Sequence, residues 1–190
     1  LDSSRNSFVT RKGPVFTNFL IADEINRAPA KTQAALFEAM QEYQVSLDGT
    51  SHALPRPFMT LATQNPLEHE GTYPLPDAQK DRFLMKLVID YPDAGEENSM
   101  VARVLEGSIG AVLSTKEMKA VMSLEDCEAT QALASRIRVD EAIIDYAVRI
   151  VRASRNSTEL QSGAGPRGSL ALVRCARASA LLDGRDFVLP

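Results

Sequence analysis

The sequence predicts an α/β part followed by an all-helical part. Before Tyr91-Pro92, short apolar runs alternate with polar turns and one helical pattern. After it, the strand-like runs disappear and apolar residues recur at helical spacing. Two adjacent carboxylates, Asp23 and Glu24, directly follow a strand-like run, which places them at the sheet edge where α/β folds bind ligands. We therefore divide the chain into residues 1–93 and residues 94–190.

Local patterns define the elements of the first part. We expect a parallel sheet carrying a β-hairpin insertion, because Asp48-Gly49 is a favoured two-residue turn. Pro29 is in the right place to open the helix that follows the first strand. The expected elements, in order, are a strand at 15–22, a helix at 31–43, the hairpin at 44–54, a strand at 58–63, a short helix at 77–83 and a strand at 85–89.

Helix signals dominate the second part. Ser114 and Ser123 each begin the spacing of a capping box, with Glu117 and with Asp126. Apolar residues at 143–151 form a long helical stripe, and a final helix over 170–182 is expected to end at Gly184.

Composition excludes several classes of protein. Among the 190 residues, 44% are hydrophobic and 24% charged, as in ordinary globular proteins, and the net charge of −4 disfavours a nucleic-acid-binding surface. No run approaches the roughly 18 apolar residues of a membrane span. Cys127 and Cys175 are too far apart for a disulfide framework or a zinc site, so we expect a cytoplasmic protein. Leu1 and Pro190 suggest that both ends are cuts through a longer protein.

The carboxylate pair and three further residues suit nucleotide hydrolysis. Asn65 ends the second strand, Arg82 follows a Gly/Pro-rich loop, and Arg167 opens a helix. Phosphoryl transfer needs carboxylates for Mg²⁺ and water, a neutral polar group for that water, and guanidiniums for the spreading charge.

Each of these features also has an ordinary explanation. The carboxylate pair could lie in a solvated turn, Asn65 could be a turn residue before proline, and Arg82 could form a salt bridge with Asp77 or Asp81.

Several sequence motifs occur along the chain in an order that indicates a protein family. They are Gly13-Pro14-Val15-Phe16, Asp23-Glu24-Ile25-Asn26-Arg27-Ala28-Pro29, Leu61-Ala62-Thr63-Gln64-Asn65-Pro66, Glu70-Gly71-Thr72-Tyr73-Pro74-Leu75-Pro76, Ala78-Gln79-Lys80-Asp81-Arg82-Phe83, Gly165-Pro166-Arg167-Gly168-Ser169 and Leu181-Leu182-Asp183-Gly184-Arg185-Asp186. Together they resemble the MoxR family of AAA+ ATPases over nearly the whole chain, and residues 96–135 are the least distinctive. The resemblance implies an AAA+ core followed by a helical lid.

This resemblance implies a role for each candidate residue, with ATP and Mg²⁺ as cofactors. Asp23 and Glu24 match the Walker B pair, the first holding Mg²⁺ through water and the second polarising the attacking water. Asn65 matches sensor 1. Arg82 matches the arginine finger, which reaches the nucleotide of the neighbouring subunit. Arg167 matches the sensor 2 arginine of the lid.

The resemblance also implies an assembly and a task. MoxR-like proteins are expected to form rings, usually hexamers, and to act as chaperone-like remodellers of protein complexes. Their expected partners carry a von Willebrand A domain. The subunit I of magnesium chelatase is a similar ATPase with a different task, and it remains an alternative.

The phosphate-binding loop is the main departure from the family pattern. No Gly-x-x-x-x-Gly-Lys-Ser/Thr occurs, and the spacing from Gly163 to Ser169 is a false match because Pro166-Arg167 replaces the required residues. We therefore expect ATP hydrolysis in a parent protein and weak or absent ATP binding by this chain alone. Two alternatives remain: a non-catalytic module for ring assembly or partner binding, and a DNA-acting AAA+ relative, which the acidic balance disfavours.

Overall fold

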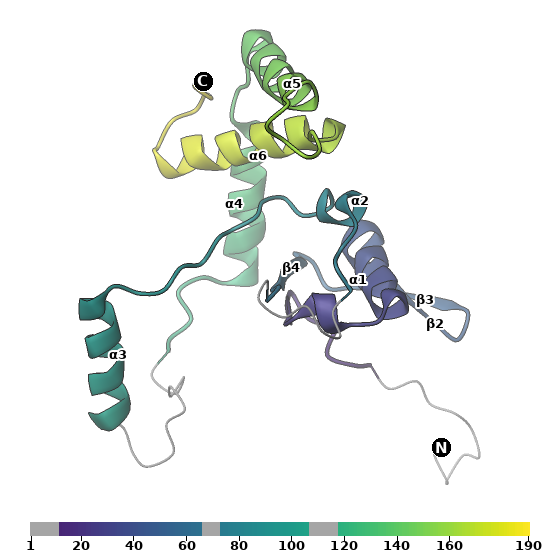
Figure 1. Ribbon diagram of the computed structural model, residues 1–190, viewed down its shortest axis with the longest axis vertical. Helices are drawn as coiled ribbons and strands as arrows, with labels where there is room; N and C mark the ends of the chain where they lie inside the picture. The colour runs from purple at the N-terminus through teal and green to yellow at the C-terminus, as the bar shows by residue number, and fades with distance from the viewer. Residues whose placement is uncertain (1–11, 66–72, 107–117) are drawn as a thin grey trace.

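The computed structural model describes residues 12–65, 73–106 and 118–190, and it has the expected α/β part followed by helices (Figure 1). The elements, in chain order, are β1 Phe19–Ala22, the 3-10 helix η1 Ile25–Arg27, α1 Ala30–Glu42, β2 Gln44–Leu47, β3 Thr50–Ala53, β4 Met59–Ala62, α2 Asp77–Lys80, α3 Ala94–Glu106, α4 Leu124–Arg136, α5 Glu141–Arg155 and α6 Pro166–Leu182.

Two strand pairs make up the β structure of the described residues. β1 and β4 are parallel neighbours, and Ala22 lies opposite Ala62 at their carboxyl ends. β2 and β3 form the antiparallel hairpin, which closes through Asp48 and Gly49 with φ of 50° and 77°. Both the parallel pairing and the hairpin turn are therefore confirmed, because positive φ at both turn residues fits a primed hairpin turn.

A small apolar cluster forms the core of the α/β part. Ile25, Phe37 and Leu75 are buried together. Phe83, which follows α2, packs edge-to-face on Phe37 with ring centroids 6.0 Å apart. This cluster joins η1, α1 and α2 into one unit, so the residues that follow β1 and α2 share a common support.

The helical part has a core of its own. Ile137, Ala180 and Val188 are buried together. The expected capping box at Ser123 is confirmed, while the one at Ser114 lies outside the described residues. The two buried clusters lie on either side of residue 93, and the exact domain boundary stays a prediction.

Two expectations about strands are wrong in part. The first strand begins only at Phe19, and one of its faces is open, with Phe19 and Ile21 exposed by 55% and 70%. The strand expected at 85–89 is absent, and this segment is an exposed extended chain between α2 and α3 (Figure 1). A strand requires a hydrogen-bonded neighbour, and within the described residues this segment pairs with none.

Gly184 provides a test of how the helical part is built. It ends α6 with φ of 68°, and the N–H of Arg185 donates to the carbonyl of Ala180 at 2.8 Å. Because a Cβ is disfavoured in this conformation, Gly184→Ala should lower the free energy of unfolding by about 1–2 kcal/mol. Gly184→Asn, the matched control, should lower it less. Chemical unfolding measures both values, and equal losses would contradict this explanation.

Candidate functional site

Thr63 joins the two strand ends at the candidate site. Its hydroxyl donates to Oδ1 of Asp23 and accepts a hydrogen bond from the backbone N–H of Glu24 at 2.8 Å. Its carbonyl accepts from the N–H of Ile25 at 3.0 Å, and its own N–H donates to Ala22 at 3.1 Å. Thr63 therefore holds the acidic pair against β4. Sequence reasoning placed Thr63 inside a motif but gave it no role.

Glu24 has a backbone conformation that is costly for a residue with a Cβ. Its φ and ψ are both 48°, in the left-handed region. Such a conformation costs roughly 1–2 kcal/mol and is characteristic of functional sites. It turns the chain sharply from β1 into η1, and the Glu24 carboxylate lies 3.1 Å from the guanidinium of Arg27. Both side chains are partly exposed, so this ion pair contributes little to stability.

Asn65 lies at the same sheet edge as the acidic pair. Nδ2 of Asn26, a side chain in η1, donates to the backbone carbonyl of Asn65 at 3.4 Å. Asn26 is only 7% exposed, and its buried Oδ1 has no hydrogen-bond partner among the described residues. An unpaired buried carbonyl oxygen is unfavourable, and a buried water molecule that donates to it would relieve this cost.

Gln33 holds the turn beneath the acidic pair. It is 2% exposed, and its Nε2 donates to the carbonyls of Ile25, Ala28 and Tyr73 at 3.3, 3.1 and 3.1 Å. One buried amide thus connects α1 to η1 and to the segment that leads into α2.

Arg82 has different partners from those considered in the sequence. Its Nη1 donates to Oε1 of Gln41 at 2.6 Å, and its guanidinium lies 5.7 Å from the ring centroid of Phe37. Asp77 instead pairs with Lys80 at 3.0 Å. The guanidinium is exposed and rests on the outer side of α1.

Arg167 is an exposed residue in the first turn of α6. Gly165, the N-cap of this helix, lies against the carboxylate of Asp81, the residue immediately before Arg82. This contact places the two arginine-bearing segments next to each other.

The candidate residues form two groups. Asp23, Glu24 and Asn65 meet at the carboxyl ends of β1 and β4. Arg82 is held on the last turn of α1, whereas the acidic pair precedes its first turn. A helix of this length spans roughly 18 Å at 1.5 Å per residue. The hydrogen-bond partner of Arg82 thus lies at the opposite end of α1 from the acidic pair, although its guanidinium also lies over Phe37, which is buried with Ile25.

The acidic group suits a magnesium ion bound largely through water. Carboxylate and hydroxyl oxygens are the donors that Mg²⁺ prefers, and it commonly uses one or two carboxylates with substrate phosphates. Among the described residues there is no cluster of three or more His, Cys, Asp or Glu side chains that could enclose a metal. A single carboxylate beside bound phosphates needs no such cluster.

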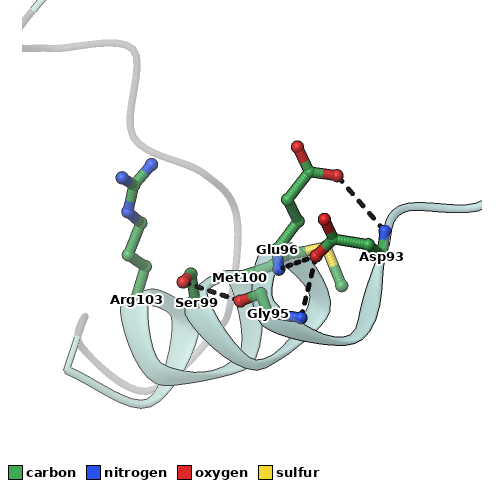
Figure 2. Close-up of a pocket in the computed structure, with 6 residues that line it drawn as sticks. All are labelled: Asp93, Gly95, Glu96, Ser99, Met100 and Arg103. Atoms are coloured by element: carbon green, nitrogen blue, oxygen red, sulfur yellow. Dashed lines mark hydrogen bonds between the residues drawn. The ribbon is translucent and has the colours of Figure 1, made fainter.

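A surface hollow on α3 is unrelated to these groups. Figure 2 shows Asp93 and Glu96 at the start of this helix, where the Asp93 carboxylate accepts from the N–H groups of Gly95 and Glu96 at 2.8 Å each. The carboxylate of Glu96 accepts in return from the N–H of Asp93 at 3.2 Å. The polar atoms in the hollow therefore cap the helix.

Comparisons with known sequences and structures agree with this architecture. The profile of the family described as "ATPase family associated with various cellular activities (AAA)" matches residues 1–85, and the AAA lid domain profile matches residues 152–190. Chaperone MoxR1 of Mycobacterium tuberculosis is 45% identical over 98% of this chain and 50% of its own length. Uncharacterized protein YeaC of Bacillus subtilis is 44% identical over 96% of this chain and 56% of its own length.

A solved structure extends the comparison to the fold. A candidate ATPase from Cytophaga hutchinsonii, 38% identical, superposes with a TM-score of 0.86 over the whole chain and 58% of its own length. The chain thus spans about half the length of the curated relatives it matches. Within the described residues, no helix is both long enough and apolar enough to cross a membrane.

The strain at Glu24 leads to a stability prediction. Glu24→Gly and Glu24→Ala both remove the carboxylate and the contact with Arg27, but only glycine adopts φ of 48° easily. We expect the glycine variant to be more stable than the alanine variant by about 1 kcal/mol. Chemical unfolding of the two variants measures this difference. An alanine variant as stable as the glycine variant would show that the turn carries no strain.

Proposed function

The chain belongs to the MoxR family of AAA+ ATPases, and from this we propose that it serves within a chaperone-like protein that hydrolyses ATP to remodel partner complexes. The observation that carries the proposal is the grouping of the candidate residues. One group supplies oxygen atoms at the carboxyl ends of two parallel strands. The other supplies guanidiniums from α1-bound Arg82 and from the start of α6.

In this proposal each residue has one role in ATP hydrolysis. Asp23 holds Mg²⁺ through water, Glu24 polarises the attacking water, and Asn65 positions that water. Arg82 and Arg167 neutralise charge on the phosphates, because a guanidinium stays charged and fits phosphate oxygens. Mg²⁺, when bound, supplies further neutralisation of the β- and γ-phosphate charge.

The separation of the two groups supports a site shared between subunits. Arg82 donates to Gln41 in the last turn of α1, whereas Glu24 precedes the first turn of this helix. An arginine held there is better placed to meet a nucleotide bound by a neighbouring copy than one bound at its own acidic pair. We propose that the copies form a closed ring, a hexamer, as the family resemblance implies.

The finer features of the function are also proposals. We propose a cytoplasmic protein whose partner carries a von Willebrand A domain, both supported by the family resemblance. The phosphate-binding loop would be contributed by a part of the parent protein outside these 190 residues. The chain alone should therefore bind ATP weakly or not at all.

A non-catalytic module for ring assembly or partner binding is a second candidate function. A chain without Gly-x-x-x-x-Gly-Lys-Ser/Thr lacks much of the usual grip on phosphates. A non-catalytic module for ring assembly would retain the fold without needing the carboxylates.

Mixing two defective variants of the parent protein tests the shared site. Glu24→Gln disables the acidic group and Arg82→Ala disables the arginine group, so each variant alone should be nearly inactive. In an equal mixture, one interface in four combines the intact halves, and we expect about a quarter of the wild-type ATPase rate. The measurement is the ATPase rate against the mixing ratio.

The outcome separates the two candidate functions. A wild-type rate that rises with protein concentration, together with recovery on mixing, supports the shared site. Unchanged activity in both single variants would favour the non-catalytic module. Loss of activity in each variant without recovery on mixing would contradict a site shared between subunits.

A further inference from the structure

The loop that precedes α6 is fixed to α5. The Nε of Arg155 donates to the carbonyl of Ala164 at 2.9 Å, and the N–H of Ala164 donates to Oγ of Ser154 at 3.0 Å. A Cβ at Gly163 would lie 2.4 Å from the Cα of Arg155, so only glycine allows this approach. The loop therefore moves together with α5 and α6.

The same loop contacts α2 in two ways. Oγ of Ser162 donates to Oδ2 of Asp77 at 3.2 Å, although 85 residues separate them. A Cβ at Gly165 would lie 2.9 Å from Oδ2 of Asp81. Lys80 binds the other oxygen of Asp77 at 3.0 Å, and the charge and hydrogen bond of Lys80, with the Ser162 hydroxyl, lower the pKa of Asp77. The carboxylate thus stays ionised as an acceptor at neutral pH.

These contacts lie next to both arginines. Arg82 directly follows Asp81, and Arg167 lies two residues after Gly165. We propose that Ser162 and Gly165, with Asp77 and Asp81, form a joint that fixes Arg82 and Arg167 relative to each other. The four joint residues are positioning residues, and the proposal rests on the proposed function because it assigns both arginines to one phosphate group.

The joint offers a reason for the glycine at the N-cap of α6. Ser, Thr, Asp and Asn are the usual caps because their side chains satisfy helix N–H groups. Gly165 provides no such side chain, and its φ of −71° needs no glycine. The close approach of Asp81 offers a reason, since a Cβ would lie 2.9 Å from Oδ2 of Asp81, and either this carboxylate or the start of α6 would have to move. A misplacement of about 1 Å is enough to reduce the rate of a reaction between positioned groups by an order of magnitude or more.

An engineered disulfide tests the geometry of the joint in the 190-residue chain. The ideal Cβ position at Gly165 lies 3.4 Å from Cγ of Asp81, the position that a cysteine Sγ would occupy. This is close to the separation of Cβ and the far sulfur in a disulfide. With Cys127→Ala and Cys175→Ala, the pair Asp81→Cys and Gly165→Cys should oxidise readily. The control pair, Glu96→Cys on α3 with Gly165→Cys, should not (Figure 1). Equal oxidation of the two pairs overturns the proposed joint.

Complementation tests what the joint does in the parent ATPase. Gly165→Leu separates the two segments, and we expect the ATPase rate to fall at least about tenfold. If the joint positions the arginines, Gly165→Leu impairs the same half of the shared site as Arg82→Ala does. It should recover about a quarter of the wild-type rate when mixed with Glu24→Gln and none when mixed with Arg82→Ala. Recovery with Arg82→Ala in place of Glu24→Gln overturns the proposed role.

A further outcome is that mixing Gly165→Leu with either Glu24→Gln or Arg82→Ala restores no ATPase activity. In that case the parent protein that carries Asp81→Cys and Gly165→Cys decides the result. A joint that stays closed predicts the same ATPase rate for the oxidised and the reduced protein, and a loss of rate on oxidation overturns it. Failure of Glu24→Gln and Arg82→Ala to complement each other would instead refute the shared site. The disulfide would still report on the joint, so the two proposals fail separately.

Discussion

The parallel pairing of β1 with β4 is the constraint on which the candidate site depends. Its register sets Ala22 opposite Ala62, so the next residues of both strands emerge at one edge. The backbone ladder continues one step further, because the N–H of Thr63 donates to Ala22. This step brings the Thr63 hydroxyl to Asp23 and to the N–H of Glu24. A slip of one residue would turn Thr63 to the opposite face and separate it from both.

The strained turn at Glu24 persists because its surroundings fix it from several sides. Thr63 binds the N–H of Glu24, and Gln33 binds the carbonyl of Ile25 immediately after it. Burial of Ile25 against Phe37 adds an apolar anchor. A conformation that costs roughly 1–2 kcal/mol survives when such contacts together outweigh it. The strained turn fixes the direction in which the chain leaves β1, and it leaves the Glu24 carboxylate partly exposed beside Asp23.

Local signals in the sequence predicted much of the fold. They failed where an element depends on contacts with residues that are distant in the sequence. The hairpin turn at Asp48-Gly49, the cap at Ser123 and the stop at Gly184 each depend on residues within one turn. The strand expected at 85–89 depends on a neighbour that the described residues do not provide. The position of the acidic pair at the sheet edge could be predicted from parallel pairing. The hydrogen bonds of Thr63 to this pair depend on the register of β1 and β4, which no local pattern determines.

The contacts of Arg82 are compatible with the catalytic role that we propose for it, because they leave its guanidinium able to move. Its hydrogen bond to Gln41 and its position over Phe37 are exposed contacts, each worth about 1 kcal/mol. The bond to Gln41 has only one charged partner, whereas a phosphate adds a negative charge and can accept two parallel bonds from the guanidinium. A phosphate on a neighbouring copy can therefore displace Gln41 while α2 stays in place. Asp81, whose carboxylate lies against Gly165, directly precedes Arg82, and in this proposal only the Arg82 side chain would move. Positioning by the joint and mobility of the guanidinium are thus compatible, because they concern different atoms of the same segment.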